Sequence, residues 1–232
     1  MVNLRFALVL CLLVSITGCA AHSMALKKGQ TDIDLKKKSI VLLSVKTVNN
    51  YEPTYQIDLL AVIICPQSES CTNPRPYLYK ANGAYKFETN RFNEYLVSLE
   101  LVPGIYSFHS IGLMYQSFFY NAGGYTPLGL PLEIKPNTIS YVGHMDVVLR
   151  KKKSEKEQTA GRETLDVAPV VQVELKNKSI AGFSTGTVDI IIEDRFSDDM
   201  KLFAAEYPAL QKAQVEKAVL PPWKRLEDQG NK

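Results

Sequence analysis

The stretch YLVSLELVPGIYSF, residues 95–108, decides the fold class. Apolar and polar side chains alternate along residues 95–102, which is the period of a β-strand with one buried face. Pro103-Gly104 then forms a turn, and a second strand pattern returns through residue 114. The pattern predicts two strands joined by a Pro-Gly corner. The side chains expected on the buried face of the first are Tyr95, Val97, Leu99 and Leu101.

Four further stretches carry the apolar and β-branched residues of strands, with no helical pattern between them. They are residues 39–48, 55–64, 139–149 and 187–194. In the second of these, one face is expected to hold Tyr55, Ile57, Leu59, Ala61 and Ile63. Strands with turn signals and no intervening helices predict a mainly β protein, an antiparallel β-sandwich, rather than a parallel α/β fold. The sandwich domain is expected to span residues 39–194.

Two segments resemble a known group of sandwich domains. LELVPGIYSF contains the corner L-x-P-G-x-Y, and LPLEIKPNTISYVGHM places a strand, a Pro-Asn turn and a strand in order. Both are similar to transthyretin-like and carboxypeptidase-regulatory-like sandwiches, so a transthyretin-like or immunoglobulin-like architecture is expected. The resemblance implies a seven-stranded, mostly antiparallel scaffold that binds or supports other molecules and rarely performs chemistry.

The strand pattern stops in two places. Residues 150–168 are highly charged and are expected to form an exposed loop. Residues 195–232 form a helical C-terminal extension, in which Ser197 caps a first helix and Pro208 opens a second that continues to about residue 218. The core-facing stripe expected on the first helix is Met200, Phe203, Ala204 and Tyr207.

Residues 1–18 have the form of an export signal. Arg5 precedes an apolar run that reaches only about half the roughly 20 residues needed to cross a bilayer. Ile16-Thr17-Gly18-Cys19 resembles the lipobox of bacterial lipoproteins. The resemblance implies cleavage after Gly18, a diacylglycerol on the Cys19 thiol and an acyl chain such as palmitate on the new amine. An ordinary cleaved signal with an incidental cysteine is the alternative.

The expected location is the bacterial cell envelope. Ala20, rather than Asp, follows Cys19 and by resemblance to enteric lipoproteins favours the outer membrane, facing the periplasm or the cell surface. Residues 19–38 are expected to be a lipidated tether. Acyl chains on Cys19 would then be the contact with the membrane.

The remaining cysteines and the charge narrow the function further. Cys65 and Cys71 are the pair left after export and lipidation, and they favour a disulfide over free thiols or a metal site. Once Arg5 leaves with the signal, the net charge is +2, and this near balance implies no nucleic acid or other polyanionic partner. No cofactor and no metal are expected.

Residues that could perform chemistry do not form a recognisable set. Ser184 lies in a literal G-x-S-x-G, but a strand pattern follows it and every histidine precedes it, unlike a nucleophile elbow. His144 and Asp146 share a strand face without a visible third member, and His109 stands apart. The acidic set at residues 193–199 lacks the spacing of a calcium loop, and helix capping accounts for Asp198 and Asp199.

The aromatic segment YQSFFYNAGGYTPLGLP, residues 115–131, offers a binding surface instead. Most of its rings are expected in the core, with Tyr120 and Tyr125 exposed beside a Gly123-Gly124 turn as candidate anchors for a protein partner. The function expected is a non-enzymatic binding or assembly module anchored by lipid. A lipid-anchored hydrolase acting on envelope polymers is the alternative.

The lipobox yields a direct prediction. Cys19→Ala is expected to leave an unprocessed precursor that takes up no fatty-acid label, because the thiol is the site of lipid attachment. Cys11→Ala, within the signal segment, is the matched control and is expected to yield the labelled mature protein. Metabolic labelling with a clickable palmitate analogue measures both, and normal labelling of Cys19→Ala would refute lipidation at this residue.

Overall fold

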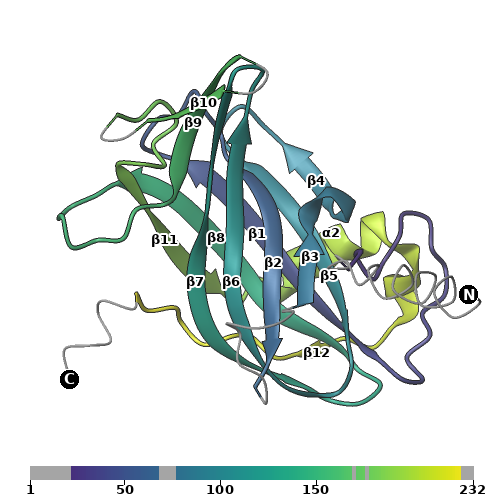
Figure 1. The fold of residues 1–232 in the computed structure, drawn as a ribbon. Helices are drawn as coiled ribbons and strands as arrows, with labels where there is room; N and C mark the ends of the chain where they lie inside the picture. The colour runs from purple at the N-terminus through teal and green to yellow at the C-terminus, as the bar shows by residue number, and fades with distance from the viewer. Residues whose placement is uncertain (1–21, 68–76, 169–170, 176–177, 226–232) are drawn as a thin grey trace, which may run out of the picture.

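The computed structural model describes residues 22–67, 77–168, 171–175 and 178–225. Two sheets of six strands each pack face to face, so the expected mainly β sandwich is confirmed (Figure 1). Sheet I has the order β11 (Gly186–Glu193), β8 (Ile139–Lys151), β1 (Ser39–Asn49), β5 (Asn93–Leu101) and β4 (Tyr85–Glu88), with β12 (Glu216–Lys217) also beside β8. Sheet II has the order β10 (Val171–Glu174), β9 (Arg162–Ala168), β7 (Tyr120–Ile134), β6 (Gly104–Gln116), β2 (Asp58–Pro66) and β3 (Tyr77–Lys80). The helices are α2 (Phe196–Glu206) and the short 3₁₀ helices η1 (Ala81–Gly83) and η2 (Pro208–Lys212).

The Pro103-Gly104 corner carries the chain from one sheet to the other. β5 pairs with β1 and β4 in sheet I, whereas β6 pairs with β2 and β7 in sheet II. The Tyr106 hydroxyl donates a hydrogen bond of 2.8 Å to the Val102 carbonyl and closes the corner. The expected buried face of β5 is confirmed, since all four of its side chains lie in the inter-sheet core.

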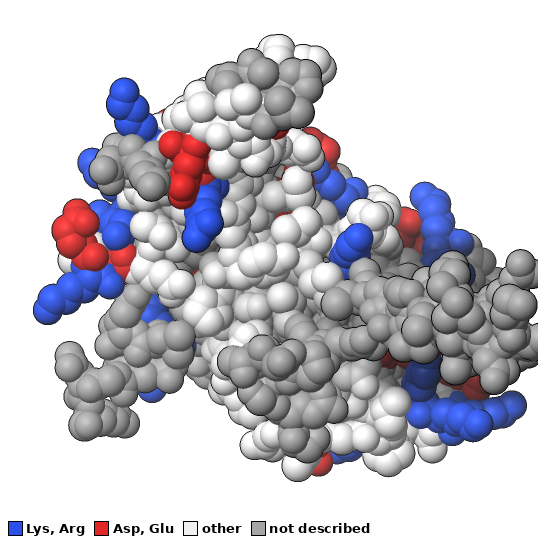
Figure 2. Space-filling model, viewed as in Figure 1, with Lys and Arg blue, Asp and Glu red and all other residues white. Residues whose placement is uncertain are grey.

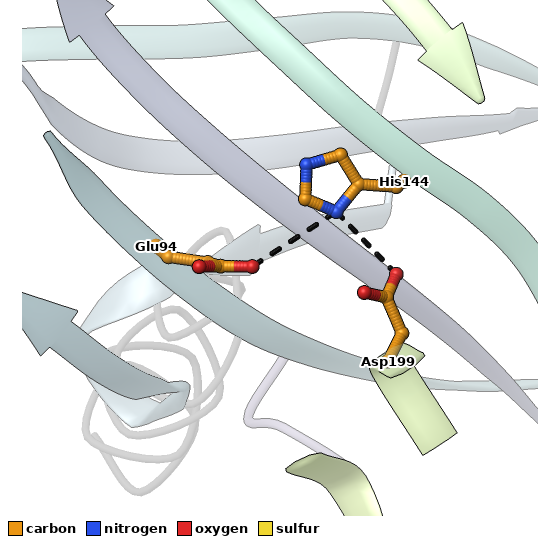
Figure 3. Close-up of side chains that lie close together, drawn as sticks. All are labelled: Glu94, His144 and Asp199. Atoms are coloured by element: carbon orange, nitrogen blue, oxygen red, sulfur yellow. Dashed lines mark ion pairs between the residues drawn. The ribbon is translucent and has the colours of Figure 1, made fainter. Parts of the chain in front are cut away.

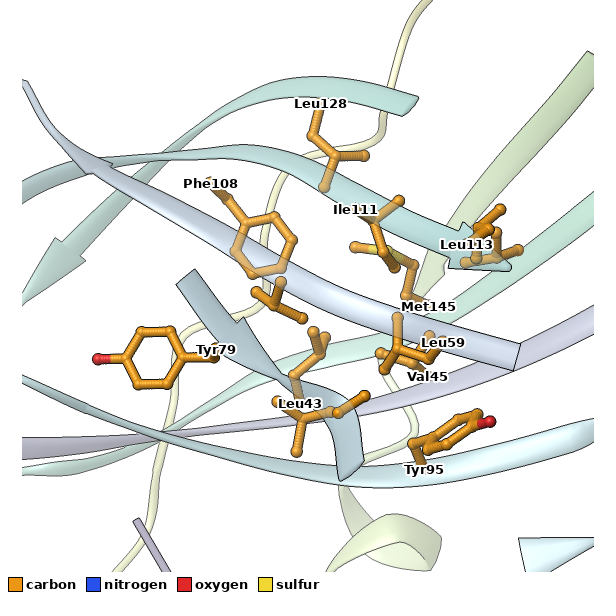
Figure 4. Packing of buried hydrophobic residues seen from close by; sticks show 14 of the residues in the cluster. Leu43, Val45, Leu59, Tyr79, Tyr95, Phe108, Ile111, Leu113, Leu128 and Met145 are labelled. Atoms are coloured by element: carbon orange, nitrogen blue, oxygen red, sulfur yellow. The ribbon is translucent and has the colours of Figure 1, made fainter. Parts of the chain in front are cut away.

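The inter-sheet core is built by side chains from both sheets (Figure 4). Phe108, Ile111 and Leu113 of β6 face Leu43 and Val45 of β1. β1 is also buried on its outer face, where Ile40 and Leu42 belong to a second apolar cluster with α2. Burial on both faces explains why residues 39–45 read as an almost unbroken apolar run. β1 and β8 run parallel, a departure from the otherwise mostly antiparallel pairing.

The expected buried face of β2 is correct only at its start. Ile57 and Leu59 lie in the core, but the register with β6 shifts between Leu59 and Ala61. The extra residue is a β-bulge, which reverses the face that each following side chain occupies. Val62 and Ile64 therefore continue the core, and Ile63 points away from it.

Two expected loops are strands. Residues 162–168 of the charged segment form β9, and Glu163 within it is fully buried. Gly123-Gly124 is no turn but lies inside β7, where β9 begins to pair with it at Gly123. The turn falls earlier, where the Ser117 amide donates to the Tyr120 carbonyl. Gly124 leaves room for the backbone of Ala160 and Gly161, just before β9, and Gly123 lies close to the Leu113 carbonyl of β6. A local turn prediction does not consider such neighbours.

The C-terminal helix is confirmed, but its ends differ from expectation. Phe203 and Tyr207 of the predicted stripe are buried against sheet I, and Met200 packs beside them. Ser197 lies inside α2 and does not cap it, while the Asp194 carboxylate accepts from the Phe196 amide at 3.2 Å. The predicted second helix ends at residue 212, because the chain then pairs with β8 as strand β12.

The predicted tether is packed onto the sandwich from residue 22. The His22 amide donates to the Leu78 carbonyl of β3, and the Ala25 amide donates to the Ser98 carbonyl of β5, each at 2.8 Å. Met24 and Leu26 are 4% and 2% exposed. Because both side chains are buried, the interpretation of residues 22–26 as part of a tether is wrong. Within the described residues, no helix is long and apolar enough to cross a membrane.

The close approach of β9 to β7 predicts a sharp steric cost. A Cβ at Gly124 would lie 2.1 Å from the Ala160 carbonyl oxygen, and backbone cannot move aside as a side chain can. Gly124→Ala is expected to lower the free energy of unfolding by about 3 kcal/mol, the upper range for overpacking. Gly83→Ala is the control, because its Cβ would meet only ordinary contacts at 3.4 Å. Urea unfolding of both variants measures the difference, and equal stabilities would contradict it.

Candidate functional site

The G-x-S-x-G segment is a loop wrapped around a buried carboxylate. Glu163, fully buried on β9, accepts hydrogen bonds from Ser179 Oγ at 2.5 Å and from the backbone amides of Ile180 and Phe183 at 2.7 and 2.6 Å. The Ser184 amide also donates to Glu163, at 3.1 Å, and the Ser184 hydroxyl donates to the Lys178 carbonyl. Ser184 is therefore engaged in holding its own loop.

These hydrogen bonds set the charge state of Glu163. Burial alone would raise the pKa of this carboxyl, but hydrogen bonds from Ser179, Ile180, Tyr120 and Ser184 outweigh it and lower the pKa below its ordinary value of 4.5. Glu163 is thus ionised at neutral pH and serves as an anionic anchor for residues 179–184.

The most concentrated group of ionisable side chains lies between sheet I and α2. His144 of β8 is fully buried, and its Nδ1 lies 3.4 Å from Asp199 Oδ2 of α2 and 3.9 Å from Glu94 Oε1 of β5 (Figure 3). Ser44 Oγ of β1 is 3.0 Å from the same nitrogen. Four elements far apart in the sequence therefore meet at one imidazole. We call Glu94, His144 and Asp199 the buried triad.

The other side of the imidazole faces a second set of charges. Nε2 lies 3.7 Å from Asp146 Oδ1 and 3.1 Å from Arg195 Nη1. Burial lowers the pKa of His144, but hydrogen bonding to Asp146 and Asp199 raises it to about 9, against an opposing effect of Arg195. The raised pKa favours an imidazolium at neutral pH, which offsets the buried charge of Asp199.

Sequence reasoning found His144 and Asp146 but missed the two triad carboxylates. The sequence pattern assigns Asp199 to helix capping, yet Asp199 is fully buried, while its neighbour Asp198 is exposed and pairs with Lys201. One signal was available, because Asp199 falls within the apolar stripe of α2 and so faces the sheet. No local pattern marks Glu94, which reaches the site through the pairing of β5 with β1.

The arrangement does not resemble a Ser-His-Asp catalytic relay. In a relay the serine and the carboxylate contact different ring nitrogens, so that the imidazole can pass a proton between substrate and nucleophile. Here Ser44 and Asp199 both approach Nδ1, and the Ser44 hydroxyl also donates to Asp199 directly. Ser44, His144 and Asp199 are all fully buried. None of these three side chains is accessible to solvent.

The other catalytic candidates are not brought together. His109 is half-buried on β6, and His22 lies against the rings of Tyr77 and Tyr79 at centroid distances of 5.1 and 5.2 Å. Among the hydrogen bonds and ion pairs of the described residues, none joins Ser184 to a histidine. The hydrolase hypothesis therefore gains no support from this geometry.

The two predicted aromatic anchors have different environments. Tyr120 is 5% exposed and its hydroxyl accepts from the Ala181 amide, so its prediction as an exposed anchor is wrong. Tyr125 is 49% exposed on β7. Among the described residues, the most exposed aromatic rings are those of Phe118 and Phe119, at 87% and 63%, and the expectation that they lie in the core is wrong. They occupy the true turn between β6 and β7, so neither can reach the inter-sheet space.

The outer faces of the two sheets differ. α2 and residues from 24 to 35 cover part of sheet I. Where described residues form the surface over the middle of sheet II, few of their side chains are charged (Figure 2). We call this surface, with the β6–β7 turn at its end, the β6–β7 face. Its outward side chains include Leu60, Ile63, Ser107, His109, Tyr125 and Pro131.

The predicted disulfide and lipid site stay predictions. Cys65 is 1% exposed at the end of β2. Cys71, its expected partner, and Cys19, the expected lipidation site, lie outside the described residues.

Comparison with protein-family models, with curated proteins and with solved structures finds no match to this chain. The functional argument therefore depends on the residues and their geometry.

The loop around Glu163 predicts an acid-sensitive stability. Because the folded-state pKa is lowered, the stabilisation is complete above the ordinary pKa of 4.5 and is lost as pH falls through the lower folded-state value. Glu163→Gln is expected to cost about 2 kcal/mol at pH 7, the scale of hydrogen bonds to a charged group. The gap to wild type should narrow below about pH 4.

Urea unfolding at several pH values measures this gap. Glu174→Gln, on the exposed strand β10, is the matched control and is expected to stay within about 0.5 kcal/mol of wild type. If Glu163→Gln has the same free energy of unfolding as wild type at pH 7, the anchoring role of Glu163 is contradicted.

Proposed function

We propose that this chain is a lipid-anchored protein of the bacterial outer membrane that works by binding a protein partner, without catalysis. Support for the address comes from the export signal and lipobox that end at Cys19. A disulfide between Cys65 and Cys71 would accord with an oxidising compartment.

The observation that carries the binding proposal is the difference between the outer faces of the two sheets. The chain uses its own α2 and N-terminal segment to cover apolar residues of sheet I, such as Leu42 and Leu96. Among the described residues, no apolar cluster of this kind covers the β6–β7 face, where Tyr125 is half exposed and Phe118 and Phe119 project at the end. Large exposed aromatic side chains are enriched among residues that dominate binding energy.

The type of partner follows from the chemistry of this face. Few charged groups lie over its middle, so long-range attraction to a polyanion or a strongly charged protein would be weak (Figure 2). Aromatic and aliphatic side chains beside polar groups such as Ser107 and His109 suit a mixed protein surface. We therefore assign the β6–β7 face to another protein of the envelope.

The double variant Phe118→Ser/Phe119→Ser tests the assignment. It is expected to weaken partner binding tenfold or more, since a hot spot is worth about 2 kcal/mol. The melting temperature should stay nearly unchanged, because neither ring is buried. In-cell photo-crosslinking from position 125, followed by mass spectrometry, measures the yield of the captured partner.

Phe87→Ser provides the control. Phe87 is 53% exposed on β4 of sheet I, away from the β6–β7 face. It should leave the captured yield intact. Equal losses in both variants, or no loss in the double variant, would argue against this face as the binding surface.

A further inference from the structure

Three potential metal ligands meet in the buried triad (Figure 3). His144 Nδ1 is 3.4 Å from Asp199 Oδ2 and 3.9 Å from Glu94 Oε1, and all three ligand atoms lie within 4.8 Å of one another. Ligands that bind tetrahedral Zn²⁺ at about 2.0–2.2 Å are themselves separated by roughly 3.3–3.6 Å. The atoms therefore stand near the spacing that one shared ion requires.

Two buried oxygens of the triad lack hydrogen-bond partners. Among the described residues, Asp199 Oδ1 and Glu94 Oε1 are both inaccessible to solvent and accept no hydrogen bond. Asp199 is fully buried, so no bulk water satisfies it. An unsatisfied buried acceptor costs about 1–3 kcal/mol, and more when it is charged. A cation bound by Glu94 Oε1 would remove this cost at Glu94. Asp199 Oδ2, the oxygen nearest His144, already accepts from Ser44 and Tyr141.

The surroundings fit a metal ligand histidine. Asp146 Oδ1 lies 3.7 Å from Nε2, on the side of the ring where an outer carboxylate orients histidines in metal sites, and Arg195 Nη1 lies 3.1 Å from the same nitrogen. Glu94, Asp146 and Asp199 bring more negative charge than Lys46 and Arg195 offset. A proton on the imidazole or a bound cation can supply the remaining positive charge. The Glu94 side chain is 14% exposed, whereas those of His144 and Asp199 are fully buried, so Glu94 is the member of the triad nearest to solvent.

We propose that Glu94, His144 and Asp199 bind a divalent transition-metal ion, with Zn²⁺ as the best match to one imidazole and two carboxylates. The ion takes the place of the proton on Nδ1, which is released to solvent, and the Ser44 hydroxyl or a water completes four ligands. It fastens α2 to sheet I through Asp199. This site departs from the sequence-based expectation of no metal, and it is independent of the proposed partner binding.

Metal uptake by the purified full chain tests the proposal. After chelator treatment and dialysis against ZnCl₂, elemental analysis should find one Zn²⁺ per wild-type chain, and thermal unfolding should shift to higher temperature. Glu94→Gln, His144→Gln and Asp199→Asn should each weaken Zn²⁺ binding by more than about tenfold, since loss of even an outer partner has an effect of that size. Equilibrium dialysis at graded Zn²⁺ concentrations gives the affinities.

Each variant has a matched control in the same chain. Glu100→Gln lies on the same strand as Glu94, Asp198→Asn is adjacent to Asp199, and His109→Gln removes another strand histidine. All three should bind Zn²⁺ as wild type does. If His144→Gln or Asp199→Asn fails to fold, the Zn²⁺ affinity of Glu94→Gln is the deciding measurement. Glu94 lies at the edge of the cluster, so its substitution is expected to disturb folding least.

Three results would overturn the proposal. The first is a wild-type chain that takes up no stoichiometric Zn²⁺. The second is a folded Glu94→Gln variant that binds as tightly as Glu100→Gln. The third is a Co²⁺-substituted protein whose spectrum shows thiolate-to-metal charge transfer, which would locate the ion at cysteines instead of the triad.

Discussion

The burial of β1 on both of its faces is the constraint on which the rest of the structure depends. Its inner side chains, Val41, Leu43 and Val45, are covered by sheet II, as in any sandwich. Its outer side chains, Ile40 and Leu42, need a second cover, because a sheet face of this composition is unstable in water. α2 and residues 25–35 provide that cover, so both of these segments outside the strands are parts of the fold.

The polar residues under this cover make the position of α2 specific. An apolar stripe alone could slide along the sheet, whereas Asp199 must meet the Tyr141 hydroxyl, Ser44 and His144 at once. Buried charges lose hydration, so such a cluster contributes less to stability than an apolar contact of equal size would. The polar cluster instead fixes the position of α2 along the sheet. Cores that mix both kinds of contact are selective as well as stable.

Local sequence patterns predicted the strands well and their placement poorly. The alternation in β5 and the apolar runs of β1 and β8 follow from which faces are buried, and each segment's own residues show this. The residues of one segment do not show which distant segment it pairs with. The parallel contact of β1 with β8, the bulge after Leu59 and the strand β9 all depend on a neighbour that no short window contains. For the same reason, the sequence predicted only one member of the buried triad. His144 lies in a clear strand pattern, whereas Glu94 and Asp199 belong to other elements.

The attachment of His22 to β3 changes how an anchored form of this protein would sit. A lipid on Cys19 would be separated from the hydrogen bond between His22 and Leu78 by three residues, which reach at most about 11 Å. A free chain from 19 to 38 could extend roughly 65 Å. The sandwich would then lie close to the membrane by its β3–β5 edge, with little freedom in height or tilt. An anchored form could then contact partners embedded in the same membrane. It could contact more distant partners only if they extended to the membrane surface.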